Sequence, residues 1–172
     1  MTRLADDLLI LARADQGGLP LKPEPLAARD LLQAAAARAR AAASREGRTI
    51  VARDPNDDGA LVLADPDRAA QAVDNLVTNA LRYGAGEIAL AVRADSEFVE
   101  LHVTDQGRGF PDDVIDRAFE RFGRADEARS SGAGSGLGLA IVEAIAHAHG
   151  GHAHARNRPE GGADVWIAFP RA

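Results

Sequence analysis

A glycine-rich segment late in the sequence has the composition of a phosphate-binding loop. It spans Gly132–Val142, with further glycines at Gly134, Gly136 and Gly138, and it runs directly into apolar residues that suit a buried helix. Because glycine loses the most backbone entropy on ordering, such a loop is expected to fold around a ligand. The unpaired N–H groups and positive dipole end of a helix would converge there on an anion. A flexible linker is the alternative interpretation.

The spacing of these glycines excludes the two commonest nucleotide-binding loops. A P-loop requires G-x-x-x-x-G-K-[ST], and the only lysine of the sequence is Lys22, far from this segment. A dinucleotide fingerprint requires G-x-G-x-x-G after a strand, whereas here G-x-G-x-G follows a polar stretch. The loop is therefore predicted to bind phosphate without belonging to either class.

A row of polar side chains on one helix offers ligands for a metal ion and for phosphate. Asn75, Asn79 and Arg82 are spaced i, i+4 and i+7 on a helix predicted over residues 67–83, so they share one face. Amide oxygens suit Mg²⁺, and a guanidinium suits phosphate oxygens. Burying such groups unpaired is costly, which favours a polar ligand, although a solvated helix face is the alternative.

An aspartate followed by two glycines ends a predicted strand. Asp105, Gly107 and Gly109 form D-x-G-x-G directly after the apolar run of residues 98–104. A carboxylate in this place could accept a hydrogen bond from an exocyclic amine, worth about 1.5–3 kcal/mol when charge-assisted. An ordinary aspartate turn that uses glycine for positive φ explains the same pattern.

The residues between the two glycine motifs have the composition of a lid. Two phenylalanines, Phe119 and Phe122, lie three residues apart and could hold a helical turn on the domain, while the polar tract of residues 125–131 stays loose. Arg121 and Arg124 are the cations of this segment.

Length, charge and composition exclude several classes of protein. The chain has 172 residues, enough for one compact domain and a short appendage, and it has no cysteine for disulfides or cysteine-bound metals. Its formal net charge of −6 argues against general nucleic-acid binding. Because it has neither a bilayer-spanning apolar run nor a signal peptide, we expect a soluble, cytoplasmic chain.

Four histidines close in sequence are a weak candidate for a metal site. His147 and His149 would point about 200° apart on a helix, and no cysteine or acidic ligand accompanies them or the neighbouring His152 and His154. We interpret all four as solvated polar positions.

Periodicity and turn residues predict the elements that must position these motifs. An N-terminal helix buries a short seam (Met1, Leu4, Leu8, Leu11), a proline-rich linker covers residues 19–25, and a capping Asp65 or Asp67 begins the helix that carries the polar row. Residues 49–52 and 60–63 are predicted to pair as a hairpin. The other predicted helices span residues 26–45 and 137–149, and the other strands span residues 87–93, 98–104, 152–156 and 163–169.

Four motifs, taken in their order along the chain, resemble the nucleotide-binding boxes of the sensor histidine kinase catalytic domain, in the GHKL ATP-binding family. They are N-L-V-T-N-A-L-R-Y (Asn75–Tyr83), D-Q-G-R-G-F (Asp105–Phe110), F-E-R-F-G-R (Phe119–Arg124) and G-S-G-L-G-L-A-I-V (Gly134–Val142). The resemblance implies an α+β Bergerat fold: a two-layer α/β sandwich whose mixed sheet of about five strands carries three helices on one face. It also implies a dimerisation-helix end at residues 1–18, a linker at 19–25 and a catalytic domain at 26–172, with its lid near 111–133.

The family's site roles then fall on matching residues. Asn79 would coordinate Mg²⁺, with Asn75 supporting it, while Asp105 would accept from the adenine amine of ATP. The other expected ATP-binding residues are Arg82, Tyr83, Gly107, Gly109, Phe110, Arg121, Arg124, Gly134, Ser135, Gly136, Leu137, Gly138 and Leu139.

One position distinguishes kinases from hydrolases in this family. Hydrolytic members carry a glutamate four residues before the magnesium asparagine, and this chain has Asn75 there. An amide cannot accept a proton from water, so the resemblance implies a phosphotransferase. Two alternatives stay open: a hydrolytic ATPase using another acid such as Asp74, which points about 100° away from Asn75, or a nucleotide sensor without catalysis.

The expected reaction is γ-phosphoryl transfer from Mg-ATP to a histidine and onward to a response-regulator aspartate. None of the five histidines fits the family's H-[ED]-x-x-[TN]-P-like acceptor motif. We therefore expect a monomeric fragment of a longer, homodimeric, membrane-anchored kinase, which acts on its own dimerisation and phosphoacceptor domain and partners a receiver domain.

Overall fold

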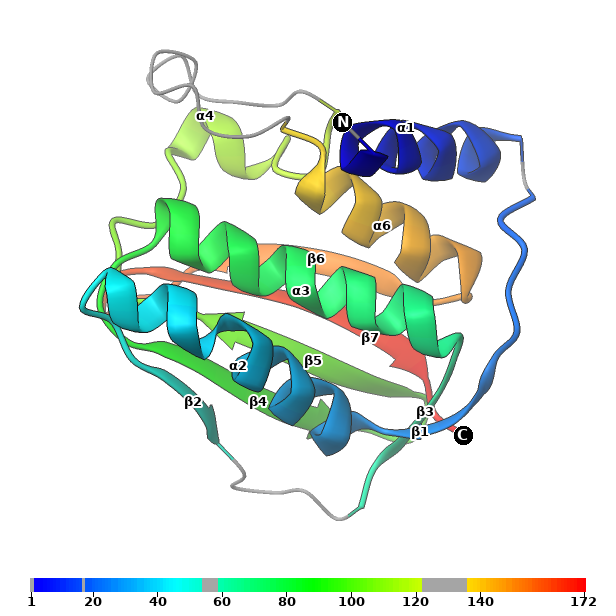
Figure 1. Ribbon diagram of the computed structural model, residues 1–172, viewed down its shortest axis with the longest axis horizontal. Helices are drawn as coiled ribbons and strands as arrows, with labels where there is room; N and C mark the ends of the chain where they lie inside the picture. Colours follow the sequence, from blue (N-terminus) through cyan, green and yellow to red (C-terminus); the bar gives the residue numbers. More distant parts are fainter. Residues whose placement is uncertain (1, 17, 54–58, 122–135) are drawn as a thin grey trace.

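The computed structural model describes residues 2–16, 18–53, 59–121 and 136–172. Its largest sheet has five strands in the order β2-β4-β5-β7-β6 (Figure 1). Strand β2 runs parallel to β4, and the other neighbours are antiparallel, so the sheet is mixed. The strands are β2 Ile50–Arg53, β4 Ile88–Ala94, β5 Phe98–Thr104, β6 His152–Asn157 and β7 Ala163–Pro170.

Three helices cover one face of this sheet, as Figure 1 shows. They are α2 Ala28–Arg45, α3 Pro66–Tyr83 and α6 Gly138–Ala148. Fully buried side chains such as Leu76, Leu101 and Ile141 fill the space between the two layers. The α+β class, the mixed five-stranded sheet and the three covering helices are confirmed.

A further pair of strands corrects the predicted hairpin. Strand β3 (Leu61–Ala64) pairs antiparallel with β1 (Glu24–Ala27), and β2 pairs with β4, so residues 49–52 and 60–63 do not pair with each other. The prediction was wrong because alternation of apolar residues identifies a strand but not its partner. Strand β1 also begins inside the predicted linker, since Pro25 is compatible with an edge strand.

Helix α3 is fixed at both ends. Of the two predicted capping residues, Asp65 is the N-cap: it accepts hydrogen bonds from the backbone N–H groups of Asp67 and Arg68, with Pro66 in the first turn. Arg48 donates to the carbonyl oxygens of Ala80 and Leu81 at the other end. The buried face of α3, which includes Val73, Leu76 and Ala80, packs on the core and leaves the polar row on another side of the helix.

The N-terminal helix α1 (Thr2–Asp15) packs on α6 (Figure 1). Only part of the predicted seam is buried: Leu11 is 3% exposed and its neighbour Ile10 is 4% exposed, whereas Leu4 and Leu8 are about half exposed. The described helices include none with the length and apolar character required to cross a bilayer.

Candidate nucleotide-binding site

The polar row of α3 lies on a partly buried face of that helix. Asn75 and Asn79 are half-buried, whereas Arg82 and the neighbouring Tyr83 are exposed. The amide nitrogen of Asn75 is buried and has no hydrogen-bond partner among the described residues. A buried donor left unpaired costs about 1–3 kcal/mol, so this atom is suited to an acceptor that the chain itself does not provide.

The Asp105 carboxylate is oriented by its own turn. Asp105 follows β5 and is only 6% exposed. Its Oδ1 accepts a hydrogen bond of 2.7 Å from the backbone N–H of Gly107. No hydrogen bond to Oδ2 from a described residue is present, so one carboxylate oxygen is fixed while the other stays available as an acceptor.

The turn at Asp105 is hydrogen-bonded to the residues that follow α3 and packs closely against them. The backbone N–H of Gln106 donates to Ala85, and the Gln106 side chain accepts from the backbone N–H of Glu87. A Cβ on Gly84 would lie 2.5 Å from Cγ of Asp105, and a Cβ on Gly107 would lie 2.8 Å from its Oδ1. Both glycines are therefore required by the protein's own packing.

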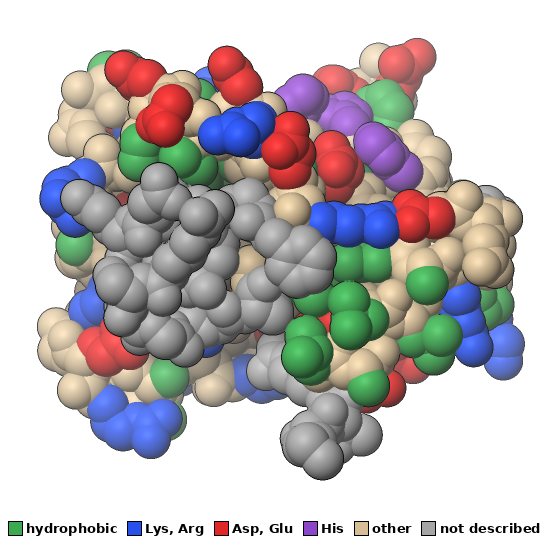
Figure 2. Space-filling model, turned by 90° about the horizontal axis from the view of Figure 1, so that it is seen from above, with side chains coloured by type: hydrophobic (Ala, Val, Ile, Leu, Met, Phe, Trp, Pro, Cys, Tyr) green, Lys and Arg blue, Asp and Glu red, His purple; other side chains and the backbone are tan. Residues whose placement is uncertain are grey.

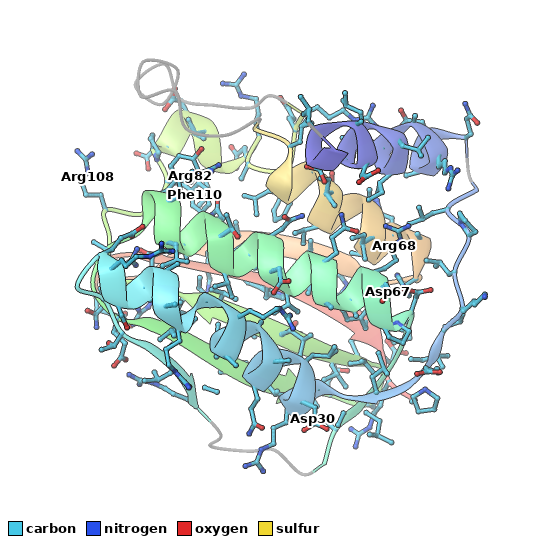
Figure 3. All side chains as sticks on the ribbon, viewed as in Figure 1. Asp30, Asp67, Arg68, Arg82, Arg108 and Phe110 are labelled. Atoms are coloured by element: carbon cyan, nitrogen blue, oxygen red, sulfur yellow. The ribbon has the colours of Figure 1, made fainter. Side chains whose placement is uncertain are left out.

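Phe110 is held by the last residue of β6. Asn157 accepts from the backbone N–H of Phe110 at 2.7 Å and donates to its carbonyl oxygen at 2.9 Å. Gly109 has a φ of 76°, and a Cβ there would lie 2.4 Å from Oδ1 of Asn157. Figure 3 shows Arg82 and Phe110 at the same end of the molecule, where α3 ends.

The start of α6 has the features of an anion site. The first turn of α6 contains no acidic residue that would repel an anion. A Cβ on Gly138 would meet no described atom within 4 Å, so space lies beside the first turn. Leu137 and Leu139, expected at the nucleotide, are buried core residues.

The lid arginine that the structure describes contacts α1. Arg121 donates to Asp15 and to the carbonyl oxygen of Leu11. Its hydrogen bond to Asp15 lowers the pKa of that carboxyl, and the same bond raises the pKa of Arg121. Three expected site residues, Arg124, Gly134 and Ser135, lie outside the described residues.

The family model of histidine kinase-, DNA gyrase B- and HSP90-like ATPases matches residues 64–172 of this chain. This range includes every described residue of the site. The chain belongs to this ATPase family. A probable sensor histidine kinase of Mycobacterium tuberculosis is 42% identical over 170 residues, which are 99% of the chain and 43% of that protein. The chain thus spans less than half the length of this relative.

Solved structures support the same family assignment. The match to full-length ShkA in complex with AMPPNP covers 99% of this chain and 35% of the ShkA chain, at 30% identity and a TM-score of 0.85. The match to the ATP-binding domain of PrrB from Mycobacterium tuberculosis covers 87% of this chain and 98% of the PrrB domain, at 29% identity and a TM-score of 0.69. Within this ATPase family, the chain is therefore similar to the ATP-binding domains of sensor histidine kinases.

The described residues also form two cavities beside α1. A groove of about 590 Å³ runs between α1, α6 and residues 119–121, and a smaller cavity separates α1 from the start of α3. Among the described residues, no group of three or more histidine, aspartate or glutamate side chains could hold a metal ion. His149 instead accepts from the backbone N–H of Asp65, and His102 is buried between Asp164 and Glu100.

Sequence patterns missed the residues that support the site from distant segments. Gly84, Asn157 and Arg158 contact the Asp105–Phe110 segment from positions 21 or more residues away in the chain. The glycine after the predicted helix end was a usable signal, because a helix commonly stops there. Neither Asn157 nor Arg158 belongs to a periodic pattern or motif.

Proposed function

We propose that this domain binds Mg-ATP between the polar row of α3, the Asp105 turn and the start of α6, and positions the γ-phosphoryl group for transfer to a histidine. The observation that carries the proposal is the buried amide nitrogen of Asn75, which no described residue pairs with and which lies one helical turn before Asn79. An amide donor facing a phosphate oxygen would satisfy it.

The residues present fit both the metal and the phosphates. The half-buried Asn79 can offer its amide oxygen to Mg²⁺, and the exposed Arg82 can reach a phosphate from the same helix face. The first turn of α6 presents backbone N–H groups beside the open space at Gly138. When bound, Mg-ATP supplies the transferable phosphoryl group, and its metal ion neutralises part of the phosphate charge.

Adenine recognition is assigned to Asp105. Its Oδ1 is occupied by Gly107, which leaves Oδ2 to accept from an exocyclic amine. The low exposure of Asp105 strengthens this charge-assisted bond, because water competes less for the carboxylate.

Transfer is favoured over hydrolysis because α3 carries an amide, and not a carboxylate, four residues before Asn79. Asn75 occupies the position where a hydrolase of this family would activate water. Asp74, the nearest alternative, is bound by Arg38 of α2 at 2.8–3.1 Å, so its carboxylate lies on the side of α3 that faces α2.

The partners follow from this reaction. Since none of the five histidines fits an acceptor motif, we assign the acceptor to a separate dimerisation domain and the next acceptor to a receiver-domain aspartate. We assign residues 1–18 to the end of that dimerisation domain's second helix, and the catalytic domain to the cytoplasmic part of a homodimeric sensor kinase.

The fate of γ-labelled ATP tests the proposal. Incubated with Mg²⁺, the chain alone should bind ATP without releasing phosphate or becoming labelled. Adding the dimerisation domain of a related sensor histidine kinase should then move label to that domain's histidine. Steady release of free phosphate by the chain alone would show that it is a hydrolase.

A further inference from the structure

The turn between β6 and β7, residues 158–162, contacts the backbone of Asp105. Arg158 donates from Nη1 to the carbonyl oxygen of Asp105 at 2.8 Å, although the two residues are 53 positions apart. The backbone N–H of Asp105 donates to the carbonyl oxygen of Ala163 at 3.1 Å, so the turn and the first residue of β7 together contact both polar groups of the Asp105 backbone.

The Arg158 guanidinium is itself held in one orientation. Its Nε and Nη2 donate to Oε1 of Glu160 at 3.1 and 2.5 Å, which leaves Nη1 directed at Asp105. The Arg158 side chain is 24% exposed, while that of Glu160 is 62% exposed. A planar guanidinium fixed through three of its donors is a rigid support, in contrast to a flexible lysine.

The backbone of the turn is packed against Asp105 with no space between them. Gly162 has a φ of 87°, and a Cβ there would lie 2.0 Å from the carbonyl oxygen of Asp105. The position of the Asp105 carbonyl is therefore defined by Gly162 and Arg158, while Gly107 defines the direction of its carboxylate.

We propose that Arg158 is a positioning residue for base selection, which holds Asp105 so that its free carboxylate oxygen faces the exocyclic amine of an adenine nucleotide. The inference rests on the proposed function, since it assigns Asp105 to the base. A 6-oxopurine presents an acceptor oxygen in place of the amine, so a fixed carboxylate repels it. Loosening Asp105 should therefore weaken binding of an adenine nucleotide more than binding of its 6-oxo analogue.

The chain offers a matched control for the loss of an arginine–carbonyl bond. Arg171 donates from Nη1 to the carbonyl oxygen of Asp95 at the same distance of 2.8 Å. Asp95 precedes β5, whereas Asp105 follows it, so the two bonds lie at opposite ends of this strand. Arg171→Ala thus removes the same kind of contact away from the base.

The experiment is calorimetric titration of Mg-ATP and Mg-ITP into the wild-type chain, Arg158→Ala, Arg158→Lys and Arg171→Ala. We expect Arg158→Ala to weaken Mg-ATP binding about tenfold and Mg-ITP binding by no more than about twofold. Arg158→Lys should recover part of the preference for ATP, because the ammonium can still donate to Asp105. Arg171→Ala should leave both affinities unchanged.

Equal weakening of both nucleotides by Arg158→Ala, or no weakening, would overturn the positioning role. If Arg158→Ala does not fold, Glu160→Ala replaces it, because this change frees the guanidinium without removing its bond to Asp105. It should lower the preference for ATP by about threefold, and an unchanged preference would overturn the role. A wild-type chain that binds neither nucleotide, or binds both equally, would instead overturn the proposed function of Asp105.

Discussion

The Asn75 side chain keeps a half-buried amide whose nitrogen has no partner among the described residues. Such a group lowers the stability of the ligand-free domain and becomes favourable only when an acceptor arrives. Natural binding sites commonly retain residues of this kind, because function and not stability selects them.

Replacing Asn75 should therefore separate stability from binding. We expect Asn75→Leu to leave the free energy of unfolding of the nucleotide-free domain unchanged or to raise it by about 1 kcal/mol, since the unpaired donor is removed. Mg-ATP affinity should fall by more than about tenfold. Urea unfolding and calorimetric titration measure the two effects.

Gln71 provides the control for Asn75, because it lies on the same helix and its amide oxygen accepts from Arg68. Gln71→Leu should leave Mg-ATP affinity unchanged. Wild-type affinity in Asn75→Leu would contradict the assignment of this amide to the phosphates.

Asp164 determines part of the response of this domain to acid. Burial alone would raise its pKa, but hydrogen bonds from His102 and Arg156 together lower it below the ordinary value of 3.8. A carboxyl whose pKa is lower in the folded state stabilises the fold above pH 3.8, and this stabilisation is lost as the pH falls through the folded pKa.

We therefore expect the free energy of unfolding to fall as the pH drops below about 4. In Asp164→Asn the fall should be smaller, because the group that takes up the proton has been removed. Urea unfolding across a pH series compares the two slopes, and identical slopes would show that Asp164 does not contribute.

At the scale of the element, the turn between β6 and β7 depends on glycine for two reasons at once. Gly162 combines a left-handed backbone with a neighbour that leaves no space for a Cβ, whereas Gly47, with a φ of 66°, has nothing within 4 Å. The two positions share the backbone requirement and differ in packing.

Alanine substitutions separate these two requirements. Gly47→Ala should cost about 1 kcal/mol, the typical cost of placing alanine in the left-handed region. Gly162→Ala should cost at least about 2 kcal/mol more, because its Cβ would meet the Asp105 carbonyl oxygen at 2.0 Å. Denaturant unfolding of both variants gives the comparison, and equal costs would contradict the packing argument.

Most elements could be predicted from the sequence, since their signals are local. A capping Asp65 or Asp67 beside Pro66 predicted the start of α3, and the apolar alternation predicted β5 directly before Asp105. The partners of β2 and β3 could not be predicted, because pairing is decided by contacts between distant segments. Arg158 was missed for the same reason: its role depends on a carbonyl group 53 positions earlier.

At the scale of the whole molecule, α1 packs on the rest of the domain through only part of its surface. Its Ile10 and Leu11 are buried, and Asp15 pairs with Arg121, yet other leucines of α1 stay exposed. Figure 2, which looks onto this side of the molecule, shows hydrophobic side chains at the surface.

Removing α1 tests the proposed domain boundary. A chain that begins at residue 19 retains β1 and the whole site, so it should unfold cooperatively and bind Mg-ATP within about threefold of the wild-type affinity. Circular dichroism during urea unfolding and calorimetric titration are the measurements. Failure of this shorter chain to fold would show that α1 is an integral part of the domain.

The central claim is the location of the nucleotide, and amide chemical shifts during a Mg-ATP titration test it most directly. We expect the largest shifts in residues 75–83, 105–110 and 136–140, which surround the proposed site on α3, the Asp105 turn and α6. Asp105→Asn should reduce these shifts at equal ligand concentration. Shifts centred instead on the groove between α1 and α6, at Leu11, Ala144 and Ala148, would contradict the account.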